Sequence, residues 1–382
     1  MKKITFLMLH LNYGGIEKQV STLANELAKD DKRYSIQVIS VYKILDKPFY
    51  ELNPNIKVKY LIDCGPNKKE IKEALKKFNI IKLFKELFKG LKIVCLKSSL
   101  MKKEIANLDT DVIVSSRIEF SKYIKRKNTL NISQEHSYIE SKSYIKKVRT
   151  SFSYIDYLVV MTEGAKKKYE EWLRPLSKSP KIICVPNMIQ SVDENKICNI
   201  ESKSIISVGR LEKIKDFETL IDVFNKISIA YPDWKLTIVG EGNDRKNIEA
   251  KIKTYGLESK IILTGSLSED DIVDRYMNSS IFVLASKSES FSLVLCEAMS
   301  YGIPCISFDV DMGPREIIKD NETGFLVKNN SKEEMIKKLK RLIEDENLRI
   351  EFSKKSKEQV KKFYSQNLIK TWKILFDIKK SV

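Results

Sequence analysis

The stretch SKSESFSLVLCEAMSYGIPCIS, residues 286–307, decides the fold class of this chain. It follows IFVLAS (281–286), an apolar run typical of a buried parallel strand, and it ends in PCISFD, a second such run. Between the runs, apolar residues recur at helical spacing as far as Gly302 and Pro304, which are helix-ending residues. This part of the chain therefore predicts a strand, a helix and a second strand, the unit from which parallel sheets are built.

The start of that helix is predicted to bind an anion. A helix N-terminus has free backbone N–H groups and the positive end of the helix dipole, and here it faces the loop after a strand. Glu289 lies at its mouth, and Glu297 lies about two turns further along the helix. An acid on an otherwise apolar helix is costly unless it binds something, although a solvated acid on an amphipathic helix explains Glu297 alone equally well.

The composition fits a soluble globular protein of two domains. Of 382 residues, 42% are hydrophobic and 31% are charged, and no apolar run approaches the roughly 20 residues that span a bilayer. The N-terminal MKKITFLMLHL is similar to a signal peptide, but it lacks a cleavage site and runs into a Gly-Gly turn, so we predict a buried strand. The six cysteines form no C-x-x-C pair, and we expect reduced residues of a cytosolic protein.

The net charge of +18 is unevenly distributed. Residues 1–188 carry 37 Lys and Arg against 20 Asp and Glu, a balance of +17. Residues 189–382 carry 32 against 31, a balance of +1. The first half is therefore basic, which implies an anionic partner for that half.

Strand-like and amphipathic segments alternate along the chain, which favours an α/β protein with parallel sheets. A polar stretch after Pro186 and Asn187 indicates a linker. We therefore expect a first domain over 1–187, a second domain over 188–365, and a last amphipathic helix over 366–382. Ligands of such sheets bind beyond the carboxyl ends of the strands, so two facing domains would form a cleft there.

Three groups of residues at predicted strand ends are candidates for a binding site. Gly14 and Gly15 open a helix, so their backbone can approach a phosphate or sugar closely, although tight turns use glycine anyway. Arg210 and Lys215 suit a diphosphate, and a solvated loop in a lysine-rich protein is the alternative. His136 also ends a strand, and a structural or exposed histidine is its alternative.

Other motifs are missing or out of place. GEGNDR (240–245) does not have the spacing of a dinucleotide-binding loop, which disfavours a Rossmann dehydrogenase. Asp309 and Asp311 form a D-x-D pattern associated with metal-bound sugar nucleotides in another fold, and we treat it here as chance. The sequence contains no zinc-spaced Cys/His set, H-E-x-x-H, G-x-S-x-G or P-loop, and we expect no metal.

The region 67–103 carries 12 lysines against 3 glutamates and predicts a basic amphipathic helix over 68–103. Such a helix can lie on an anionic membrane surface, where each lysine contributes ~1 kcal/mol, and packing on the sheet is the alternative. Nucleic acid is disfavoured because the aromatic residues align with the apolar face. The apolar residues recur every three or four positions: Ile71, Leu75, Phe78, Ile81, Phe84, Phe88 and Leu91.

Together these features resemble the retaining glycosyltransferases of family 4. Their GT-B fold has two Rossmann-like domains with parallel sheets facing a central cleft, and a C-terminal helix that crosses back to the first domain. Glu289 and Glu297, eight positions apart, match the paired glutamates of the family, whereas Ser292 stands where the family commonly has glycine. The motifs that carry the resemblance, in order along the chain, are GGIEK, SVGRLEKIKDF, ESFSLVLCEAMSYGIPCI, GPREII and NETGFLV.

The resemblance implies a nucleotide-sugar donor as co-substrate, with a UDP-hexose favoured, and no other cofactor. Glu297 would bind the ribose hydroxyls. Glu289 would hold the donor sugar and phosphate together with the backbone N–H groups of Phe291, Ser292 and Leu293.

The resemblance also implies roles for four further residues. Arg210 and Lys215 would stabilise the leaving diphosphate, Gly15 would approach it, and His136 would lie near the donor sugar. Fixed cations and a helix N-terminus can replace a metal at a developing negative charge. No side chain stands out as a nucleophile, so we expect front-face attack with retention.

We therefore predict a retaining, metal-independent glycosyltransferase, peripheral at the cytoplasmic face of the plasma membrane. It would move a hexose or N-acetylhexosamine from a UDP-sugar to a growing, lipid-linked cell-surface glycan such as a polysaccharide, lipopolysaccharide or capsule. The alternative is a catalytically idle module that binds nucleotide sugars or glycans. A sugar-nucleotide epimerase is disfavoured because its sequence patterns are not seen.

Overall fold

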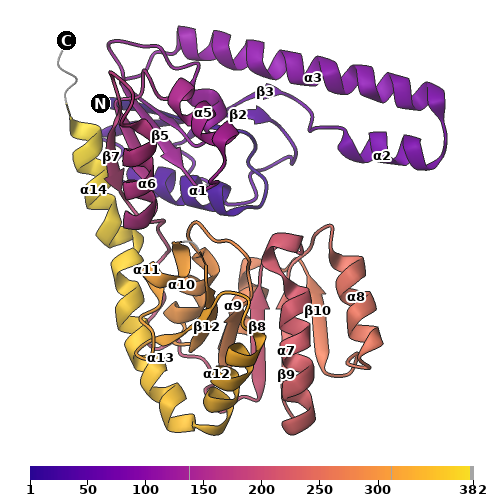
Figure 1. The fold of residues 1–382 in the computed structure, drawn as a ribbon. Coiled ribbons are helices and arrows are strands. Elements are labelled where there is room, and N and C mark those ends of the chain that lie inside the picture. The colour runs from indigo at the N-terminus through magenta and orange to yellow at the C-terminus, as the bar shows by residue number, and fades with distance from the viewer. Residues whose placement is uncertain (137, 311, 379–382) are drawn as a thin grey trace. The chain divides into compact units, whose positions relative to one another are not determined.

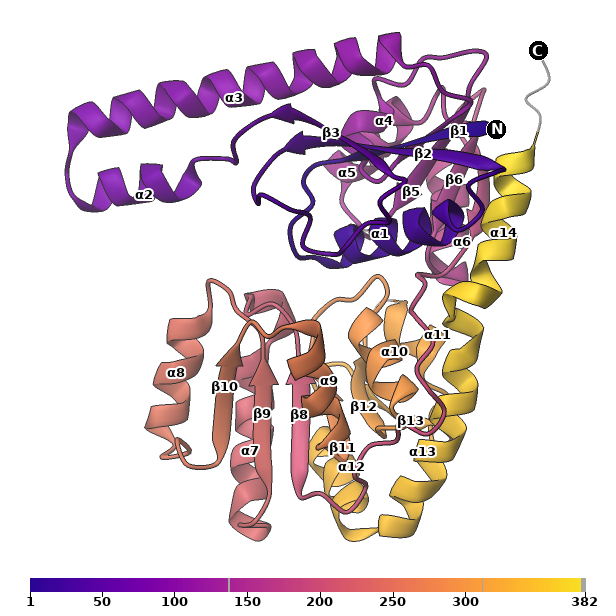
Figure 2. The same ribbon diagram turned by 180° about the vertical axis from the view of Figure 1, so that it is seen from behind.

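The computed structural model describes residues 1–136, 138–310 and 312–378, and the chain divides into two compact units (Figures 1 and 2). Unit 1 consists of Met1–Met188 and Leu368–Val382, and unit 2 of Ile189–Asn367. Each unit contains a parallel sheet with helices packed on it, which confirms the predicted class of two Rossmann-like domains.

In the described part of unit 1, seven parallel strands lie in the order β3-β2-β1-β4-β5-β6-β7. The strands are β1 (Lys2–Met8), β2 (Tyr34–Tyr42), β3 (Lys57–Ile62), β4 (Val112–Ser115), β5 (Leu130–Glu135), β6 (Tyr157–Val160) and β7 (Lys181–Cys184). The helices are α1 (Gly15–Ala28), α2 (Lys68–Lys76), α3 (Ile80–Asn107), α4 (Ile118–Ser121), α5 (Lys142–Ser151) and α6 (Glu163–Leu173). Central strands such as β4 and β5 are buried along their whole length, because helices cover both faces of the sheet.

Over the described residues of unit 2, six parallel strands lie in the order β10-β9-β8-β11-β12-β13. The strands are β8 (Ser204–Val208), β9 (Lys235–Val239), β10 (Ile261–Gly265), β11 (Ile281–Leu284), β12 (Cys305–Asp309) and β13 (Gly324–Lys328). The helices are α7 (Phe217–Ala230), α8 (Arg245–Thr254), α9 (Glu269–Met277), α10 (Leu293–Ser300), α11 (Gly313–Ile317), α12 (Lys332–Glu344) and α13 (Glu346–Val360). The predicted strand, helix and strand around residues 286–307 are thus β11, which precedes this stretch, α10 and β12.

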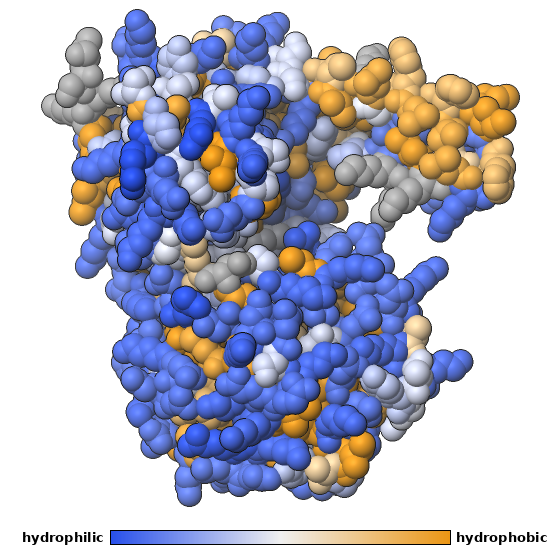
Figure 3. Space-filling view, viewed as in Figure 1, coloured by the Kyte–Doolittle hydropathy of each residue, from blue (hydrophilic) through white to orange (hydrophobic). Residues whose placement is uncertain are grey.

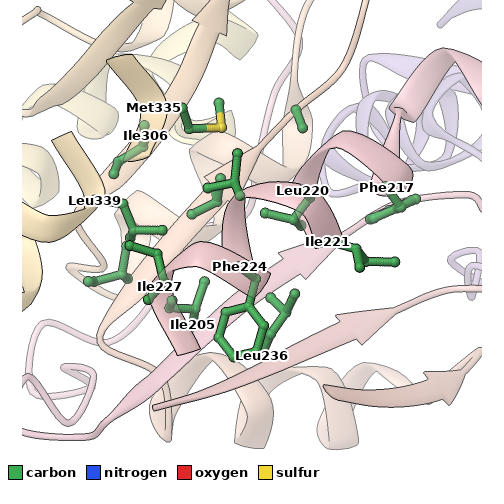
Figure 4. Packing of buried hydrophobic residues seen from close by; sticks show 14 of the residues in the cluster. Ile205, Phe217, Leu220, Ile221, Phe224, Ile227, Leu236, Ile306, Met335 and Leu339 are labelled. Carbon is green, nitrogen blue, oxygen red and sulfur yellow. The ribbon is translucent and has the colours of Figure 1, made fainter. Parts of the chain in front are cut away.

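The core of unit 2 explains why its sheet is a firm support for a site. The apolar face of α7 packs against strands β8 and β9 and against α12, with each of these side chains at most 1% exposed (Figure 4). Burying a side chain of this size contributes about 1.5–3 kcal/mol. The residues on α7 are Leu220, Ile221, Phe224 and Ile227, and those facing them include Ile205, Leu236, Met335 and Leu339.

Both sheets reverse their strand order beside their first strand. In unit 1, β1 pairs with β2 on one side and with β4 on the other, and in unit 2, β8 pairs with β9 and with β11. The loops that follow β1 and β4, or β8 and β11, diverge at these points. Such topological switch points are where doubly wound sheets bind ligands.

The last helix, α14 (Ser365–Asp377), packs on unit 1. Trp372 and Phe376 on this helix are at most 1% exposed. The ammonium of Lys373 lies 3.2 Å from a carboxylate oxygen of Asp30, and Asp377 pairs with Arg33. Contacts between residues far apart in the sequence therefore hold α14 on unit 1.

The single helix expected over 68–103 is wrong, because the segment forms two helices, α2 and α3. Phe78 between them has a left-handed backbone (φ 46°), and the N–H groups of Phe78 and Asn79 bond back to the carbonyls of Leu75 and Ala74. These bonds close the C-terminus of α2, and the Asn79 side chain caps the N-terminus of α3. None of the described helices is long and apolar enough to cross a membrane.

Candidate active site

In unit 2 the structure brings together two residues that the sequence predicts to share a site. Lys215 lies in the loop after β8, Glu289 lies in the loop after β11, and their side chains form an ion pair. Ser286 donates a hydrogen bond of 2.7 Å from its hydroxyl to the same carboxylate oxygen, Oε1. The Lys215 and Glu289 side chains are 19% and 8% exposed, so the pair is well shielded from water. It lies at the switch point of this sheet.

Arg210 precedes Lys215 in the same loop and is exposed. No hydrogen bond or ion pair of its guanidinium is seen among the residues that the structure describes. Arg210 is thus a cation in the same loop as Lys215, and no carboxylate of the described residues neutralises it. Such a cation is suited to a phosphate, which the planar fork of arginine recognises well.

GEGNDR has a structural role in holding the Arg210 loop. A Cβ added to Gly240 would lie 1.9 Å from the carbonyl oxygen of Gly209, and one added to Gly242 would lie 2.3 Å from that of Leu211. The glycines therefore let the two loops pack closely. The N–H groups of Gly209 and Leu211 donate to the carbonyls of Val239 and Glu241, each at 3.0 Å.

The N-terminus of α10 provides the predicted anion-binding groups. Ser292 is its N-cap residue, but the Ser292 side chain makes no capping hydrogen bond to the first N–H groups of the helix. The hydroxyl of Ser292 is buried and has no hydrogen-bond partner in the described ranges. Phe291 packs edge to face on Phe363, with ring centroids 5.4 Å apart, which fixes the loop before the helix. The backbone N–H groups of this turn are therefore not capped by the Ser292 side chain.

Glu297 lies within α10 and is partly buried. The hydroxyl of Tyr276 on α9 donates a hydrogen bond of 3.2 Å to its Oε2. Burial and then the charge of Glu297 raise the pKa of Tyr276 well above its usual value, so the hydroxyl stays protonated and keeps donating. Glu297, an acid on an otherwise apolar helix, thus has a hydrogen-bond partner within unit 2, and Tyr276 orients its carboxylate.

In unit 1, the predicted Gly-Gly loop stands beside an acid that the sequence interpretation overlooked. Gly14 caps α1 in a conformation that disfavours side chains (φ 158°), and a Cβ there would lie 2.2 Å from Oε2 of Glu17. Glu17 is only 4% exposed and folds back over the loop. Glu17 is part of the motif GGIEK, and this position was the sequence feature that could have identified it.

His136 follows β5, and its Nε2 is buried without a hydrogen-bond partner among the described residues. Burial, and then the charge of Arg117, lowers the pKa of His136 to about 4, so the ring is neutral at pH 7. Arg117 follows β4 and also escaped the sequence interpretation. No structural feature here separates the predicted role of His136 at the donor sugar from its alternatives, and that role stays a prediction.

The D-x-D pattern is partly accounted for. Both oxygens of Asp309 accept hydrogen bonds from the guanidinium of Arg315, at 2.9 and 2.7 Å, and Asp311 lies outside the described residues. Across residues 1–136, 138–310 and 312–378, no group of three or more His, Cys, Asp or Glu side chains is placed to hold a metal ion.

Two doubly wound units, with cations after β8 and paired glutamates after β11, define a glycosyltransferase of the GT-B class. The chain belongs to the family described as glycosyl transferases group 1, whose model matches residues 193–359. A Haemophilus influenzae relative named an uncharacterized glycosyltransferase is 30% identical, with 98% of this chain and 99% of the relative covered. The chain is therefore a glycosyltransferase family member over its whole length.

Other relatives and solved structures agree with this class. A Campylobacter jejuni relative is 28% identical over 95% of this chain and 96% of its own; its name is N-acetylgalactosamine-N,N'-diacetylbacillosaminyl-diphospho-undecaprenol 4-alpha-N-acetylgalactosaminyltransferase. Sucrose-phosphate synthase from Thermosynechococcus elongatus superposes with a TM-score of 0.75 at 18% identity, covering 98% of each chain. HepE from Anabaena, solved with UDP and glucose, has a TM-score of 0.72 at 14% identity, covering 99% of this chain and 100% of that one. At these identities the solved structures support the fold alone.

Proposed function

We propose that the protein is a retaining glycosyltransferase that moves a hexose or N-acetylhexosamine from a UDP-sugar to a hydroxyl of a lipid-linked glycan. The observation that carries the proposal is the ion pair of Lys215 and Glu289 in the loops after β8 and β11, the second of which leads into α10. Arg210, in the same loop as Lys215, is paired with no carboxylate of the described residues. This arrangement offers positive charge and N–H groups to a diphosphate and a carboxylate to sugar hydroxyls.

The chemistry follows from where charge develops. Cleavage of the bond between sugar and phosphate leaves a negative diphosphate, and Arg210, Lys215 and the first N–H groups of α10 stabilise it without reorganising. These fixed groups remove the need for a metal. Glu289 is held by Lys215 and by Ser286, so it orients the donor rather than attacking it.

We infer retention from the same geometry. The acceptor hydroxyl attacks on the face that the diphosphate leaves, and the departing phosphate oxygen takes the hydroxyl proton. The bond from the anomeric carbon to the phosphate oxygen breaks as the bond to the acceptor oxygen forms. We assign Glu297 to the ribose of the donor and keep Gly15 and His136 as predicted donor contacts.

The donor and acceptor classes rest on the relatives. The HepE structure contains UDP and glucose, which supports a UDP-sugar for this chain. The names of two Campylobacter jejuni relatives specify acceptors on undecaprenol diphosphate, and a Salmonella typhimurium relative is named a lipopolysaccharide 1,6-galactosyltransferase. A growing cell-surface glycan on a lipid carrier is the acceptor class that fits all three.

A screen of UDP-, GDP- and ADP-sugars with a prenyl-diphosphate-linked saccharide as the acceptor tests this function. We expect UDP release and a product whose new linkage keeps the anomeric configuration of the donor, as measured by NMR. Glu297→Ala should lose transfer while remaining folded, whereas Lys203→Ala, which removes an exposed ion pair with Asp233, should not change it. Donor binding without UDP release from any pair would instead identify an idle binding module.

We also propose that α2 and α3 hold the protein on the cytoplasmic face of the plasma membrane. Figure 3 shows apolar side chains gathered over these helices, and Figures 1 and 2 show their outer ends extending past the edge strand β3. The most exposed are Phe78 (90%), Ile81 (84%), Phe88 (73%) and Phe84 (69%). These four side chains are therefore not packed on the sheet, whereas Met101 and Ile105 further along α3 are buried.

Phe78 supports insertion into lipid in particular. A left-handed residue at a helix C-terminus is usually glycine, and a side chain with this backbone costs about 1–2 kcal/mol. In water, an exposed phenylalanine with this backbone has both the conformational cost and a solvated apolar ring. Burial of the ring in lipid would offset that cost. Each such ring that leaves water contributes about 1.5–3 kcal/mol, against ~1 kcal/mol for each lysine near an anionic surface.

Sedimentation with vesicles of anionic and of neutral phospholipid tests this attachment. We expect Phe84→Ser with Phe88→Ser to abolish pelleting with both, and Lys82→Gln with Lys85→Gln to weaken it with anionic vesicles only. Ile229→Ser, at an equally exposed apolar residue of unit 2 (73%), is the matched control and should pellet as the wild type does. Pelleting that persists in the Phe84 and Phe88 variant contradicts the proposal.

A further inference from the structure

A second ion pair joins the loops after β8 and β11, and the proposed donor chemistry does not use it. The ammonium of Lys287 lies 3.2 Å from Oδ2 of Asp216. The backbone N–H of Lys287 also donates a hydrogen bond of 2.8 Å to the carbonyl of Ile214. Ile214 and Asp216 are the two neighbours of Lys215 in the sequence. The loop after β8 is therefore held to the loop after β11 on both sides of Lys215.

Asp216 has an unusual backbone for a residue with a side chain. Its φ of 49° and ψ of 46° are left-handed, a conformation that aspartate tolerates better than most residues but that glycine usually adopts. Asp216 ends the short 3₁₀ turn Lys213–Lys215 and precedes α7, so the chain turns sharply directly after Lys215. A backbone of this kind persists where the surrounding structure holds it, and it occurs often at functional sites.

The Asp216 side chain does not cap α7 in the usual way. An aspartate before a helix normally accepts a hydrogen bond from one of the first backbone N–H groups, and Asp216 makes no such bond. Its Oδ2 instead accepts a hydrogen bond of 2.8 Å from the hydroxyl of Thr219 and faces Lys287. The Asp216 side chain is only 10% exposed. The contacts that fix this shielded carboxylate are therefore those to Thr219 and to the neighbouring loop.

The two ion pairs between these loops have opposite polarity. Lys215 pairs with Glu289, and the next residue, Asp216, pairs with Lys287. A shift of the loops that brought Lys215 toward Lys287 would also bring Asp216 toward Glu289, so like charges would meet. Such repulsion disfavours the wrong arrangement. The two pairs together therefore favour one alignment of the loops.

The path of the Lys215 side chain shows why this alignment matters. Its aliphatic part passes over Gly209, where an added Cβ would lie 3.6 Å from Cδ and 3.7 Å from Cε of Lys215. From there the ammonium reaches Glu289. A cation that stabilises a developing charge is most effective when it is already in place, because it then has no reorganisation to undergo.

We propose that Asp216 is a positioning residue that sets Lys215 for the donor diphosphate. It acts through its ion pair with Lys287 and through the turn that it imposes after Lys215. This inference rests on the proposed glycosyl transfer, and it adds a residue pair to the groups that are assigned to the donor.

Double-mutant kinetics test whether Asp216 acts through Lys215. Asp216→Asn keeps the size of the side chain and suits the left-handed backbone, but it removes the charge that faces Lys287. We expect kcat for UDP release to fall at least fivefold in the wild-type background and to change less than twofold in the Lys215→Gln background. Lys287→Gln should reproduce the loss, and Lys287→Arg, which keeps the charge, should retain at least half of the wild-type kcat.

Asp222→Asn is the matched control. Asp222 is a partly buried acid on α7 that pairs with Lys251 and Lys332, away from the loops after β8 and β11. Its loss should lower Tm and leave kcat unchanged. An unchanged kcat in Asp216→Asn or in Lys287→Gln would overturn the proposal. It would also be overturned by an equal fall in both Lys215 backgrounds, or by a fall in Asp222→Asn that matches the fall in Asp216→Asn.

Calorimetric titration of UDP gives a measurement that does not depend on turnover. We expect Asp216→Asn to weaken the Kd for UDP at least threefold, and to cause no further weakening in the Lys215→Gln background. If the wild type releases no UDP from any donor, the proposed function is contradicted, and the titration still tests the positioning of Lys215. In that case, equal Kd values for the wild type and Asp216→Asn, or no UDP binding by the wild type, would overturn the inference.

Discussion

The switch points of the two units are built alike but carry different charge. In unit 1, Glu17 on the first connection meets Arg117 after β4, and in unit 2, Glu289 after β11 meets Lys215 on the first connection. Each sheet thus has one buried carboxylate and one cation across its central strand pair. Only unit 2 adds a further cation, Arg210, that no carboxylate of the described residues neutralises. The same frame therefore carries a surplus cation in unit 2, whereas in unit 1 the ion pair of Glu17 and Arg117 is balanced.

The largest expected effect comes from breaking the pair in unit 2. Lys215→Ala leaves the buried Glu289 carboxylate without its cation, which should destabilise the protein by about 3–5 kcal/mol. Under the proposed function it also removes a cation that would stabilise the leaving diphosphate, so kcat should fall by about 10²–10³. Urea unfolding and UDP-release rates measure the two effects. An unchanged unfolding midpoint would show that the pair does not hold the loop.

Gly240→Ala tests whether the second loop supports the Arg210 loop. The added methyl would lie 1.9 Å from the backbone oxygen of Gly209, in a conformation that disfavours side chains (φ 143°). We expect a loss of about 2–4 kcal/mol in unfolding free energy and a weaker Kd for UDP by calorimetry. Gly256→Ala is the control, because its Cβ would meet nothing within 4 Å although its φ of 63° is also positive. Equal losses in both variants would mean that backbone strain alone, and not contact between the loops, explains the effect.

The neutral histidines of unit 1 give a smaller, pH-dependent effect. The pKa of His136 is about 4 in the folded chain and about 6.5 when unfolded, so the unfolded state binds more protons as the pH falls below 6.5. Its contribution to stability is complete above pH 6.5 and is lost toward pH 4, by about 1.4 kcal/mol per pH unit. His136→Gln should therefore lose less stability than the wild type between pH 6.5 and 5, as measured by urea unfolding. Parallel curves for the two proteins would contradict a neutral His136.

Ser292→Gly should have the smallest effect. The hydroxyl has no hydrogen-bond partner among the described residues, so its loss removes a buried unsatisfied group, while the added backbone freedom costs about 0.5–1 kcal/mol. We expect a change of at most about 1 kcal/mol in stability. The donor Kd should stay within threefold of the wild type, because we assign phosphate binding to the backbone N–H groups and not to this side chain. A tenfold weaker Kd would instead assign phosphate binding to the Ser292 side chain.

The site of unit 2 was more predictable than that of unit 1 for a physical reason. Arg210, Lys215 and Glu289 each follow an unmistakable buried strand, and parallel strands bring their carboxyl ends together. The pairing of Lys215 with Glu289 itself could not be read, because it depends on how two loops fold. Glu17 and Arg117 are 100 positions apart, and their contact becomes visible only once β1 and β4 are known to be neighbours.

The buried strands of both sheets could be predicted from their apolar sequences, whereas the exposed edge of the first sheet could not. β3 reads KVKYLI, and its lysines and partial exposure hide an edge strand that the sequence interpretation missed. The break between α2 and α3 was missed because phenylalanine gives no signal for a left-handed residue. Its neighbour Asn79, a good N-cap residue, was the clue that was available.

The most direct test of the central claim is the rate of UDP release by Arg210→Ala at saturating donor and acceptor. Arg210 is exposed and has no protein partner in the described ranges, so its loss should leave Tm unchanged. We expect kcat to fall at least 100-fold with that unchanged Tm. A variant that releases UDP at the rate of the wild type would contradict a diphosphate site at the switch point of unit 2.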